Sequence, residues 1–383
     1  MKILEIHNRY LSIGGEDVIV DHISKTLSLR HQTCQFFRSS KEWKEPGAPP
    51  SWKQPFLLFN NPDSLQEIEA LHQSFKPDIW LIHNTIPVIS LGVYELAYRL
   101  KAKVVQYLHN YRPFSPSGTS YVSGKPVSLK SDWAEIQSGT WQNSSLKTTF
   151  ISGAFWKLRH SQAYQSIHRW VAISDFQKIK MIEAGLPADR THRLYHSWNQ
   201  KNQDLKRSDR GYYLFLGRLT EEKGIRTLLQ TWQKLGQKSD PSTLIICGEG
   251  PLEKEIQKAT SLNPKIEFRG SVTGDTKSRL LSECRALIAP SLWWEPLGLI
   301  VYEAYQHHKP IFAAHSGGLQ EAVLHEQTGF LHEPGNSEEL YNQILTFNQD
   351  PEHFSFMGEK GNEWLQENTS PDQWLDCFEN IIF

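Results

Sequence analysis

The sequence is short of cysteine, of net charge and of long apolar runs. Its four cysteines are scattered without a Cys-x-x-Cys pair, which argues against a zinc site or a disulfide framework and fits free thiols in a reducing cytoplasm. The formal net charge of −1 argues against nucleic acid as a partner, because nucleic-acid-binding proteins usually carry a strong basic excess. No run reaches the roughly 18 apolar residues of a membrane span, so a cytoplasmic protein is expected.

The first residues also lack the features of a signal peptide and of a dinucleotide-binding turn. The opening MKILEIHNRY has a short apolar run broken by Glu5, which predicts a first strand instead of a signal peptide. The turn after that strand reads SIGGED and lacks the Gly-x-Gly-x-x-Gly fingerprint, which argues against a nicotinamide-dependent dehydrogenase.

Short apolar runs alternate with helical patterns along the whole chain, which predicts an α/β protein with parallel sheets covered by helices. The length of 383 residues suits two domains of about 190 residues each. The first is expected over 1–197 and the second over 212–367, with a polar linker at 198–211 and a last helix at about 368–383. The expected strands are Lys2–Ile6, Asp78–Ile82, Lys103–Leu108, Trp170–Ile173, Tyr212–Leu216, Thr243–Cys247, Lys265–Phe268, Ala286–Pro290 and Ile311–Ala314. The apolar stripe of the last helix is expected to contain Trp374, Leu375, Cys377, Phe378 and Ile381.

Two carboxylates, Glu295 and Glu303, have seven residues between them in a segment that is expected to run from strand through loop to a helix starting near Gly298. A helix N-terminus attracts phosphate through its free N–H groups and its dipole. Glu303 would lie one turn inside this helix, where it can accept hydrogen bonds from two hydroxyls of a ribose, while Glu295 faces a second polyol. The alternative is a surface helix with two solvated glutamates. The pattern favours a nucleotide-sugar site.

This segment resembles the EPFGxxxxEAxxxGxP block of GT-B-fold retaining glycosyltransferases, glycosyltransferase family 4. Leu297 stands where phenylalanine is usual, and His308 stands where glycine usually ends the helix in a left-handed conformation. The resemblance covers nearly the whole chain. It implies two doubly wound Rossmann-like domains that face a central cleft, with a C-terminal helix that crosses back to the first domain.

Two cations follow the strand at 212–216. Arg218 and Lys223 lie in the string GRLTEEKG, five positions apart, so both can point to one place. They can equally be solvated cations paired with Glu221 and Glu222. The string resembles the family's G-R-x-x-x-x-K-G block, which implies that Arg218 and Lys223 bind the donor diphosphate. By the same resemblance, Val272 packs on the nucleotide base.

The first turn, Gly14-Gly15-Glu16, opens the first helix. Glycines allow a close approach of the backbone to a ligand, and an acid at a helix start is also ordinary. The turn resembles the GGED opening of one branch of the family. The resemblance implies that Gly14 and Gly15 face the donor phosphate and that Glu16 lies on the acceptor side.

Two histidines follow strands of the first domain. Side chains at the carboxyl ends of parallel strands line ligand sites, although a lone histidine is usually structural. His109 lies in LHNYRP, which resembles the family's LHNYR block and implies contact of His109 with the transferred sugar. Tyr111 and Arg112 of this string, and His83-Asn84 after the preceding strand, are assigned to the acceptor side.

The aromatic segment 150–170 has two interpretations. It can be a helix that packs on the first domain, or it can meet a lipid-linked acceptor at a membrane face.

The resemblance implies a hexosyltransferase-type enzyme of polysaccharide or glycoconjugate biosynthesis that keeps the anomeric configuration of the sugar. Glu295 and His109 would orient the sugar, and Glu303 would hold the ribose. No cofactor and no metal are expected, because no Asp-x-Asp occurs and the departing diphosphate has cations and N–H groups to stabilise it. These groups belong to Arg218, Lys223, Leu299 and Ile300.

The expected partners are a nucleotide-sugar donor, such as a UDP- or GDP-sugar, and a glycan or lipid-linked acceptor. The sequence allows peripheral contact with the inner membrane face. Two alternatives remain. A phosphorylase-like enzyme would need a cofactor lysine, and no specific candidate is found. A non-catalytic nucleotide-sugar or carbohydrate-binding protein of GT-B fold would not need both Glu295 and His109.

Overall fold

The computed structural model describes residues 1–11, 14–199, 208–237, 242–352, 354 and 356–383. These residues form two compact units. The first consists of residues 1–118, 128–199 and 369–383, and the second of residues 119–127 and 200–368. Of the expected linker at 198–211, residues 200–207 lie outside the described part of the chain. The segment 119–127 belongs to the second unit, whereas the sequence analysis placed it in the first domain.

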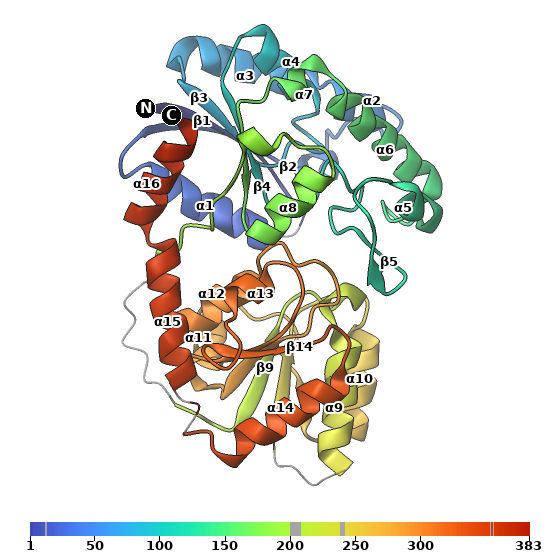
Figure 1. Ribbon diagram of the computed structural model, residues 1–383. Helices are drawn as coiled ribbons and strands as arrows, with labels where there is room; N and C mark the ends of the chain where they lie inside the picture. The colour runs from blue at the N-terminus through green and yellow to red at the C-terminus, as the bar shows by residue number, and fades with distance from the viewer. Residues whose placement is uncertain (12–13, 200–207, 238–241, 353, 355) are drawn as a thin grey trace. The chain divides into compact units, whose positions relative to one another are not determined.

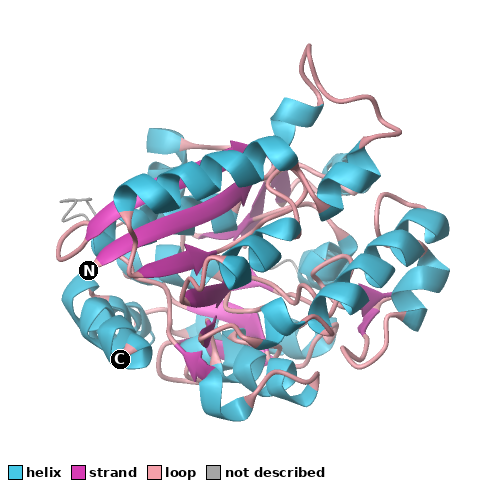
Figure 2. Cartoon of the chain, turned by 90° about the horizontal axis from the view of Figure 1, so that it is seen from above, coloured by secondary structure: helices cyan, strands magenta, loops and turns pink. Residues whose placement is uncertain are grey.

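The first unit contains a six-stranded parallel sheet with the order β2-β1-β3-β4-β7-β8. Its strands are β1 (Lys2–Arg9), β2 (Gln32–Ser39), β3 (Ile79–Ile82), β4 (Val104–Leu108), β7 (Arg169–Ala172) and β8 (Thr191–Arg193). Its helices are α1 (Gly15–Leu27), η1 (Ser40–Trp43), α2 (Gln54–Phe59), α3 (Pro62–Phe75), α4 (Gly92–Arg99), α5 (Trp133–Ser138), α6 (Ser145–Arg159), α7 (Gln162–Gln165), α8 (Asp175–Glu183), η2 (Ala188–Arg190) and α16 (Pro371–Ile382). Figure 2 shows how helices cover the strands.

The second unit contains another six-stranded parallel sheet, with the order β11-β10-β9-β12-β13-β14. Its strands are β9 (Tyr212–Leu216), β10 (Thr243–Cys247), β11 (Ile266–Phe268), β12 (Ala286–Ala289), β13 (Ile311–Ala314), β14 (Gly329–His332) and the hairpin β5 (Tyr121–Val122) and β6 (Lys125–Pro126). Its helices are η3 (Glu221–Lys223), α9 (Ile225–Gln237), α10 (Glu253–Leu262), α11 (Gly274–Glu283), α12 (Leu299–Gln306), α13 (Leu319–Ala322), α14 (Ser337–Gln349) and α15 (Phe356–Thr369).

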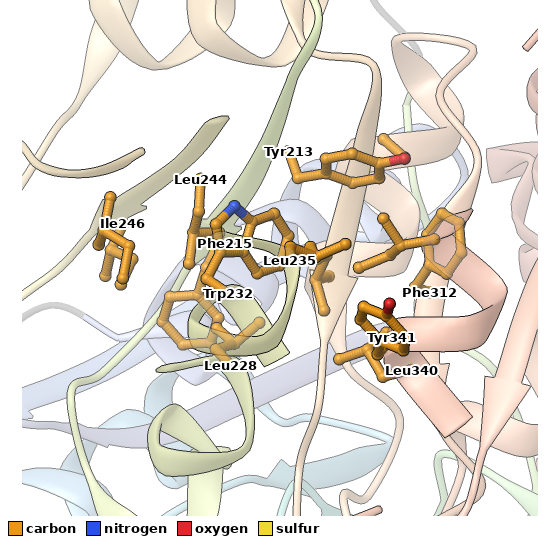
Figure 3. Close-up of a cluster of buried hydrophobic side chains, with 14 of the residues drawn as sticks. Tyr213, Phe215, Leu228, Trp232, Leu235, Leu244, Ile246, Phe312, Leu340 and Tyr341 are labelled. Atoms are coloured by element: carbon orange, nitrogen blue, oxygen red, sulfur yellow. The ribbon is translucent and has the colours of Figure 1, made fainter. Parts of the chain in front are cut away.

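The central strands form because they are short apolar runs that can be buried on both faces of a parallel sheet. Every residue of β12 and β13 is buried. Helix α9 packs on this sheet through apolar side chains three or four residues apart, including Leu228, Trp232 and Leu235. Figure 3 shows these side chains beside Tyr213 and Phe312 of the sheet. This core holds the parallel strands side by side, so that their carboxyl ends lie along one edge of the sheet.

Helix α16 packs against α1, so the last described segment completes the first unit (Figure 1). Its buried face includes Trp374, Phe378 and Ile382. The stripe expected from the sequence was wrong at its edge, because Cys377 is exposed and Ile381 is only partly buried. None of the described helices has the length and apolar character that crossing a bilayer requires.

Candidate functional site

The strand order of the second unit reverses between β9 and β12, and ligands of doubly wound sheets bind beyond such a point. The loops after these two strands are held together. The backbone N–H of Leu292 donates to the carbonyl of Glu222 at 2.8 Å. Gly224 has a φ of +75°, and a Cβ there would lie 1.8 Å from the carbonyl oxygen of Pro290. Only glycine therefore allows this approach of the two loops.

The two loops bring Lys223 and Glu295 into an ion pair. The ammonium Nζ lies 2.7 Å from Oε2 and 3.0 Å from Oε1 of the buried carboxylate. Ser291 Oγ and Trp293 Nε1 donate to Oε2 at 3.0 and 2.9 Å. Burial raises the pKa of Glu295, but the charge of Lys223 and these hydrogen bonds outweigh it and bring the pKa below its ordinary value. Glu295 is therefore an ionised, oriented acceptor.

A glycine turn from the loop after β13 holds Glu295 in place. The N–H of Gly318 donates to the carbonyl of Glu295 at 2.7 Å. Gly317 has a φ of +62°, and a Cβ at this position would lie 2.1 Å from the same carbonyl oxygen. Ser316 Oγ also donates to the carbonyl of Trp293 at 2.6 Å. The position of the carboxylate thus depends on Gly317, where a side chain would collide with the carbonyl oxygen of Glu295.

Helix α12 begins at Leu299, as the sequence predicts, so the N–H groups of Leu299 and Ile300 lie at its N-terminus. The first N–H groups of a helix have no partner within the helix and suit an anion. Glu303, one turn further, accepts a hydrogen bond from Lys277 Nζ of α11 at 2.6 Å. The helix therefore presents donors at its first turn and a carboxylate at its second.

A residue with a left-handed backbone conformation flanks α12 on each side. Gly298 precedes the helix with a φ of +89°, where a Cβ would lie 2.6 Å from Leu319 Cδ2. His308 follows it with a φ of +54°, so the expectation of a left-handed histidine at this position is confirmed. His308 Nδ1 lies 2.8 Å from Glu359 Oε2, which holds the ring outside the helix end.

The side-chain hydrogen bonds described for Glu295 come from Lys223, Ser291 and Trp293, and neither Arg218 nor Val272 is among these donors. The exposed Arg218 is paired with Glu222 at 3.3 Å, so its side chain does not join Lys223 at Glu295. This is one of the pairings that the sequence left open for a solvated cation. Val272 is half-buried in the loop between β11 and α11. The roles assigned to both residues remain predictions.

In the first unit, His83 follows β3 and His109 follows the neighbouring β4, so both histidines lie at one edge of the sheet. His83 Nδ1 and His109 Nε2 are 2.9 Å apart. Burial, with smaller contributions from neighbouring histidines, brings both pKa values well below the ordinary value. Both rings are therefore neutral at pH 7, and one ring N–H donates to the lone pair of the other.

His109 is also held by aromatic neighbours. His196, after β8, stacks on it with ring centres 5.5 Å apart, and Tyr107 lies on it at 5.0 Å. Tyr107 and His196 stack on each other at 5.8 Å. The orientation of His109 is thus set by packing as well as by its bond to His83.

Glu16 joins a polar network at the start of α1. Its Oε2 accepts from Tyr10 Oη at 2.9 Å and from Asn110 Nδ2 at 3.1 Å. Arg112 Nη1 donates to the same Tyr10 oxygen at 3.2 Å. Burial raises the pKa of Glu16 above its ordinary value, against the charges of His7 and Arg112. The network keeps one carboxylate oxygen oriented by two donors.

The other predicted residues of the first unit are arranged around these groups. Gly14 is the N-cap of α1 and Gly15 its first residue, and a Cβ at Gly14 would meet no atom within 4 Å. Asn84 is buried and donates to the carbonyls of Asn8 and Ile86 at 2.7 and 3.1 Å, which is a structural role. Tyr111 is fully buried.

A pocket that is partly open to solvent lies within the first unit. It brings together most of the predicted first-domain residues. Its lining includes Glu16, His83, Asn84, His109, Asn110 and Arg112.

The sequence analysis missed several residues that contribute to the two sites, and some of them have no local signal in the sequence. Lys277, which binds Glu303, lies on a polar helix with other charged residues. Ser291 and Trp293 lie beside Glu295 and could have been found as donors near a carboxylate. His196 follows a three-residue strand too short to predict, and Tyr10 follows the first strand without any motif.

Residues 196–364 match the family described as Glycosyl transferases group 1. The matched residues contain β9 to β14 and the cluster at Glu295, so the second unit has the sequence pattern of that family.

Similar sequences include transferases of different sugars. The chain is 26% identical to the sulfoquinovosyl transferase SQD2 of Arabidopsis thaliana over 93% of this chain and 64% of that protein. An alpha-D-kanosaminyltransferase of Streptomyces kanamyceticus is 23% identical over 49% of this chain and 51% of that protein. An uncharacterized 42.6 kDa protein in the cps region of Klebsiella pneumoniae is 26% identical over 67% of this chain and 62% of that protein. The chain thus spans less than two thirds of the length of these relatives.

Similar solved structures extend over the whole chain. Anabaena HepE, in a structure with UDP-glucose, is 18% identical with a TM-score of 0.70, and the match covers 99% of this chain and 100% of that one. The sucrose-phosphate synthase of Thermosynechococcus elongatus is 16% identical with a TM-score of 0.70, and the match covers 99% of this chain and 98% of that one. These likenesses concern the fold. The GT-B fold with two doubly wound parallel sheets is confirmed.

Proposed function

We propose that this protein transfers a sugar from a nucleoside-diphosphate sugar to a hydroxyl acceptor and keeps the anomeric configuration of the sugar. The observation that carries the proposal is the cluster at Glu295, Lys223 and the start of α12, within residues that match a glycosyl transferase family. The names of the relatives support sugar transfer, and the structure of HepE with UDP-glucose supports a UDP-sugar as donor.

Most of the groups that would hold the donor belong to the second unit, and Gly14 and Gly15 belong to the first. The N–H groups of Leu299 and Ile300 suit the diphosphate, because they lie at a helix N-terminus. Lys223 supplies a point charge, and its two hydrogen bonds to Glu295 leave a third N–H direction for a phosphate oxygen. Glu303 would accept from the two ribose hydroxyls, in competition with Lys277. Gly14, Gly15, Arg218 and Val272 keep the donor-side roles that the resemblance implies.

In the reaction, the bond between the anomeric carbon and the diphosphate oxygen breaks, and a bond from the acceptor oxygen forms on the same face. The acceptor proton passes to the departing phosphate oxygen. Oriented donors such as Lys223 stabilise the negative charge as it develops, and such groups can lower a barrier by several kcal/mol. We propose that this stabilisation needs no metal ion and no cofactor. Glu295 and His109 would orient the sugar.

The acceptor would be a glycan or a lipid-linked sugar, so that the reaction contributes to polysaccharide or glycoconjugate synthesis. The first-unit pocket with Glu16, His83 and Arg112 would bind acceptor hydroxyls. A hexosyl group is the proposed sugar.

The proposal is tested by calorimetric titration of UDP-, GDP- and ADP-sugars with and without a chelator. One donor is expected to bind in chelator and to lose about tenfold or more in affinity in Glu303→Ala, because a hydrogen bond to a charged group contributes about 1.5–3 kcal/mol. The matched control is Glu255→Ala, which removes an exposed carboxylate of the same unit. Binding without sugar transfer to any glycan or lipid acceptor would favour the non-catalytic alternative, and binding of no donor would overturn the proposal.

A further inference from the structure

Helix α6 is apolar on two sides. Its inner side is buried in the first unit and includes Ile151, Phe155 and Leu158. Its outer side carries Leu146 and Phe150, which are four residues apart and therefore neighbours on the helix surface. Leu146 is 81% exposed. A helix that is apolar beyond its packed face has a second apolar surface to cover.

Helix α2 extends this outer side. Phe59 of α2 meets Phe150 of α6 edge to face, with ring centres 5.2 Å apart, and the two helices lie side by side in Figure 1. Phe56, one turn before Phe59, and Trp52, just before the helix, are each 68% exposed. Trp156 on α6 is exposed as well. We call this region the α2–α6 surface, formed by Trp52, Lys53, Phe56, Leu146, Lys147, Phe150, Trp156 and Lys157.

The exposed aromatic residues are concentrated here. Single exposed apolar side chains are normal on a protein surface and need no explanation. Among the large apolar side chains that are exposed in the described ranges, the three tryptophans are Trp52, Trp133 and Trp156. Trp133 lies on α5, which packs against α6. Tryptophan is the side chain most characteristic of the boundary between lipid and water.

The two segments that carry this surface contain basic but no acidic side chains. Residues 46–62 contain no aspartate or glutamate, and neither do residues 136–174, although the chain as a whole is nearly neutral. Lys53 lies over the ring of Trp52, with Nζ 5.3 Å from its centre. Lys147 and Lys157 are exposed at the two ends of α6. Lysines interleaved with aromatic side chains complement an anionic lipid headgroup layer.

We propose that the α2–α6 surface docks the first unit onto an anionic lipid bilayer. The aromatic side chains would enter the headgroup layer, while the lysines would contact the lipid phosphates. This proposal goes beyond sugar transfer and does not depend on it, since it concerns only the outer side of the first unit. It also unites both interpretations of the segment 150–170, because one side of α6 packs and the other would meet lipid.

Flotation of the full chain with lipid vesicles tests the proposal. The chain is expected to float with vesicles of phosphatidylcholine and phosphatidylglycerol and to bind pure phosphatidylcholine at least tenfold more weakly. Lys147→Gln/Lys157→Gln should weaken binding roughly 25-fold, from about five-fold for each lysine near the surface. The control pair Lys254→Gln/Lys258→Gln, exposed on α10, should change it less than twofold.

The aromatic contribution is tested with Phe150→Ser/Trp156→Ser, whose folding is checked by circular dichroism and melting. This pair should lose most of the binding, whereas Ile179→Ser/Leu262→Ser, two exposed apolar residues elsewhere, should keep it. Equal losses in test and control pairs would overturn the proposal, as would an absence of flotation with anionic vesicles. Self-association that disappears in Phe150→Ser/Trp156→Ser, without vesicle binding, would assign the surface to a second copy of the chain instead.

Discussion

Replacement of Lys223 with methionine would isolate the buried ion pair of the second unit. The side chains of Lys223 and Glu295 are 20% and 11% exposed. Removal of one partner from a fully buried pair costs about 3–5 kcal/mol, because it leaves an uncompensated charge. The wild-type pair is not fully buried, and Ser291 and Trp293 would still donate to the carboxylate in the variant. We therefore expect a loss of about 2–3 kcal/mol in the free energy of unfolding. For a unit of this size, that is a fall in melting temperature of about 5–10 °C.

The loss should depend on pH in a defined direction. In the wild type the pKa of Glu295 is below its ordinary value, so its contribution to stability is present above the unfolded pKa and is lost as pH falls through the folded pKa. Without Lys223, burial would dominate and raise the folded pKa above the unfolded one. The contribution would then be lost as pH rises through the folded pKa. The loss of stability caused by Lys223→Met should therefore be larger at pH 8 than at pH 5.

A double-mutant cycle measured by scanning calorimetry at both pH values tests this reasoning. It compares the wild type, Lys223→Met, Glu295→Gln and the double variant, with an expected coupling of about 2 kcal/mol. The control cycle uses Lys234→Met and Glu338→Gln, an ion pair of the same unit whose side chains are 36% and 62% exposed. Exposed pairs contribute about 1 kcal/mol or less. Equal coupling in both cycles, or a deficit independent of pH, would refute the argument.

Two further predictions concern backbone and histidine. Gly317→Ala should destabilise the chain by more than about 3 kcal/mol and weaken nucleotide binding, since its Cβ would collide with the Glu295 carbonyl. Gly335→Ala is the control: it is also at positive φ, but its Cβ would make only an ordinary van der Waals contact with Leu292 Cδ2 at 3.6 Å, so it should cost about 1 kcal/mol. Calorimetry and nucleotide titration would show this difference, and equal losses of stability in the two variants would contradict it. Burial lowers the pKa of His196 to about 3, so its contribution to stability is present above the unfolded pKa and falls by about 2 kcal/mol between pH 6.5 and 5. Urea unfolding should show a flatter pH dependence in His196→Gln, and an unchanged slope would count against the assignment.

The central strands could be predicted from the sequence because they are continuous apolar runs. Tyr212–Leu216, Thr243–Cys247 and Ile311–Ala314 have in the structure the bounds that the sequence predicts. Three of the four edge strands, β2, β8 and β14, were missed, whereas the edge strand β11 was predicted one residue too long. β2 contains five polar residues in QTCQFFRS, and β14 contains a glycine and a histidine, so neither has the apolar run of a strand buried on both faces.

The site could be predicted only where its residues are close in the sequence. Glu303 could be placed on its helix because the N-terminus of α12 is marked by Gly298. The contact between Lys223 and Glu295 joins residues 72 positions apart, and it depends on β9 lying next to β12. Strand order is a property of the whole sheet, and no local pattern encodes it. The same holds for His196, which reaches His109 only because the sheet continues to β8.

Helix α16 has a consequence for the synthesis of the chain on the ribosome. The first unit lacks this helix until residues 200–368 have been translated, although most of its other residues are made first. At about 5–20 residues per second, that interval is on the order of ten to thirty seconds. Meanwhile the places of Trp374 and Phe378 on the first unit stay uncovered. The unit whose translation begins first is therefore the last to be completed.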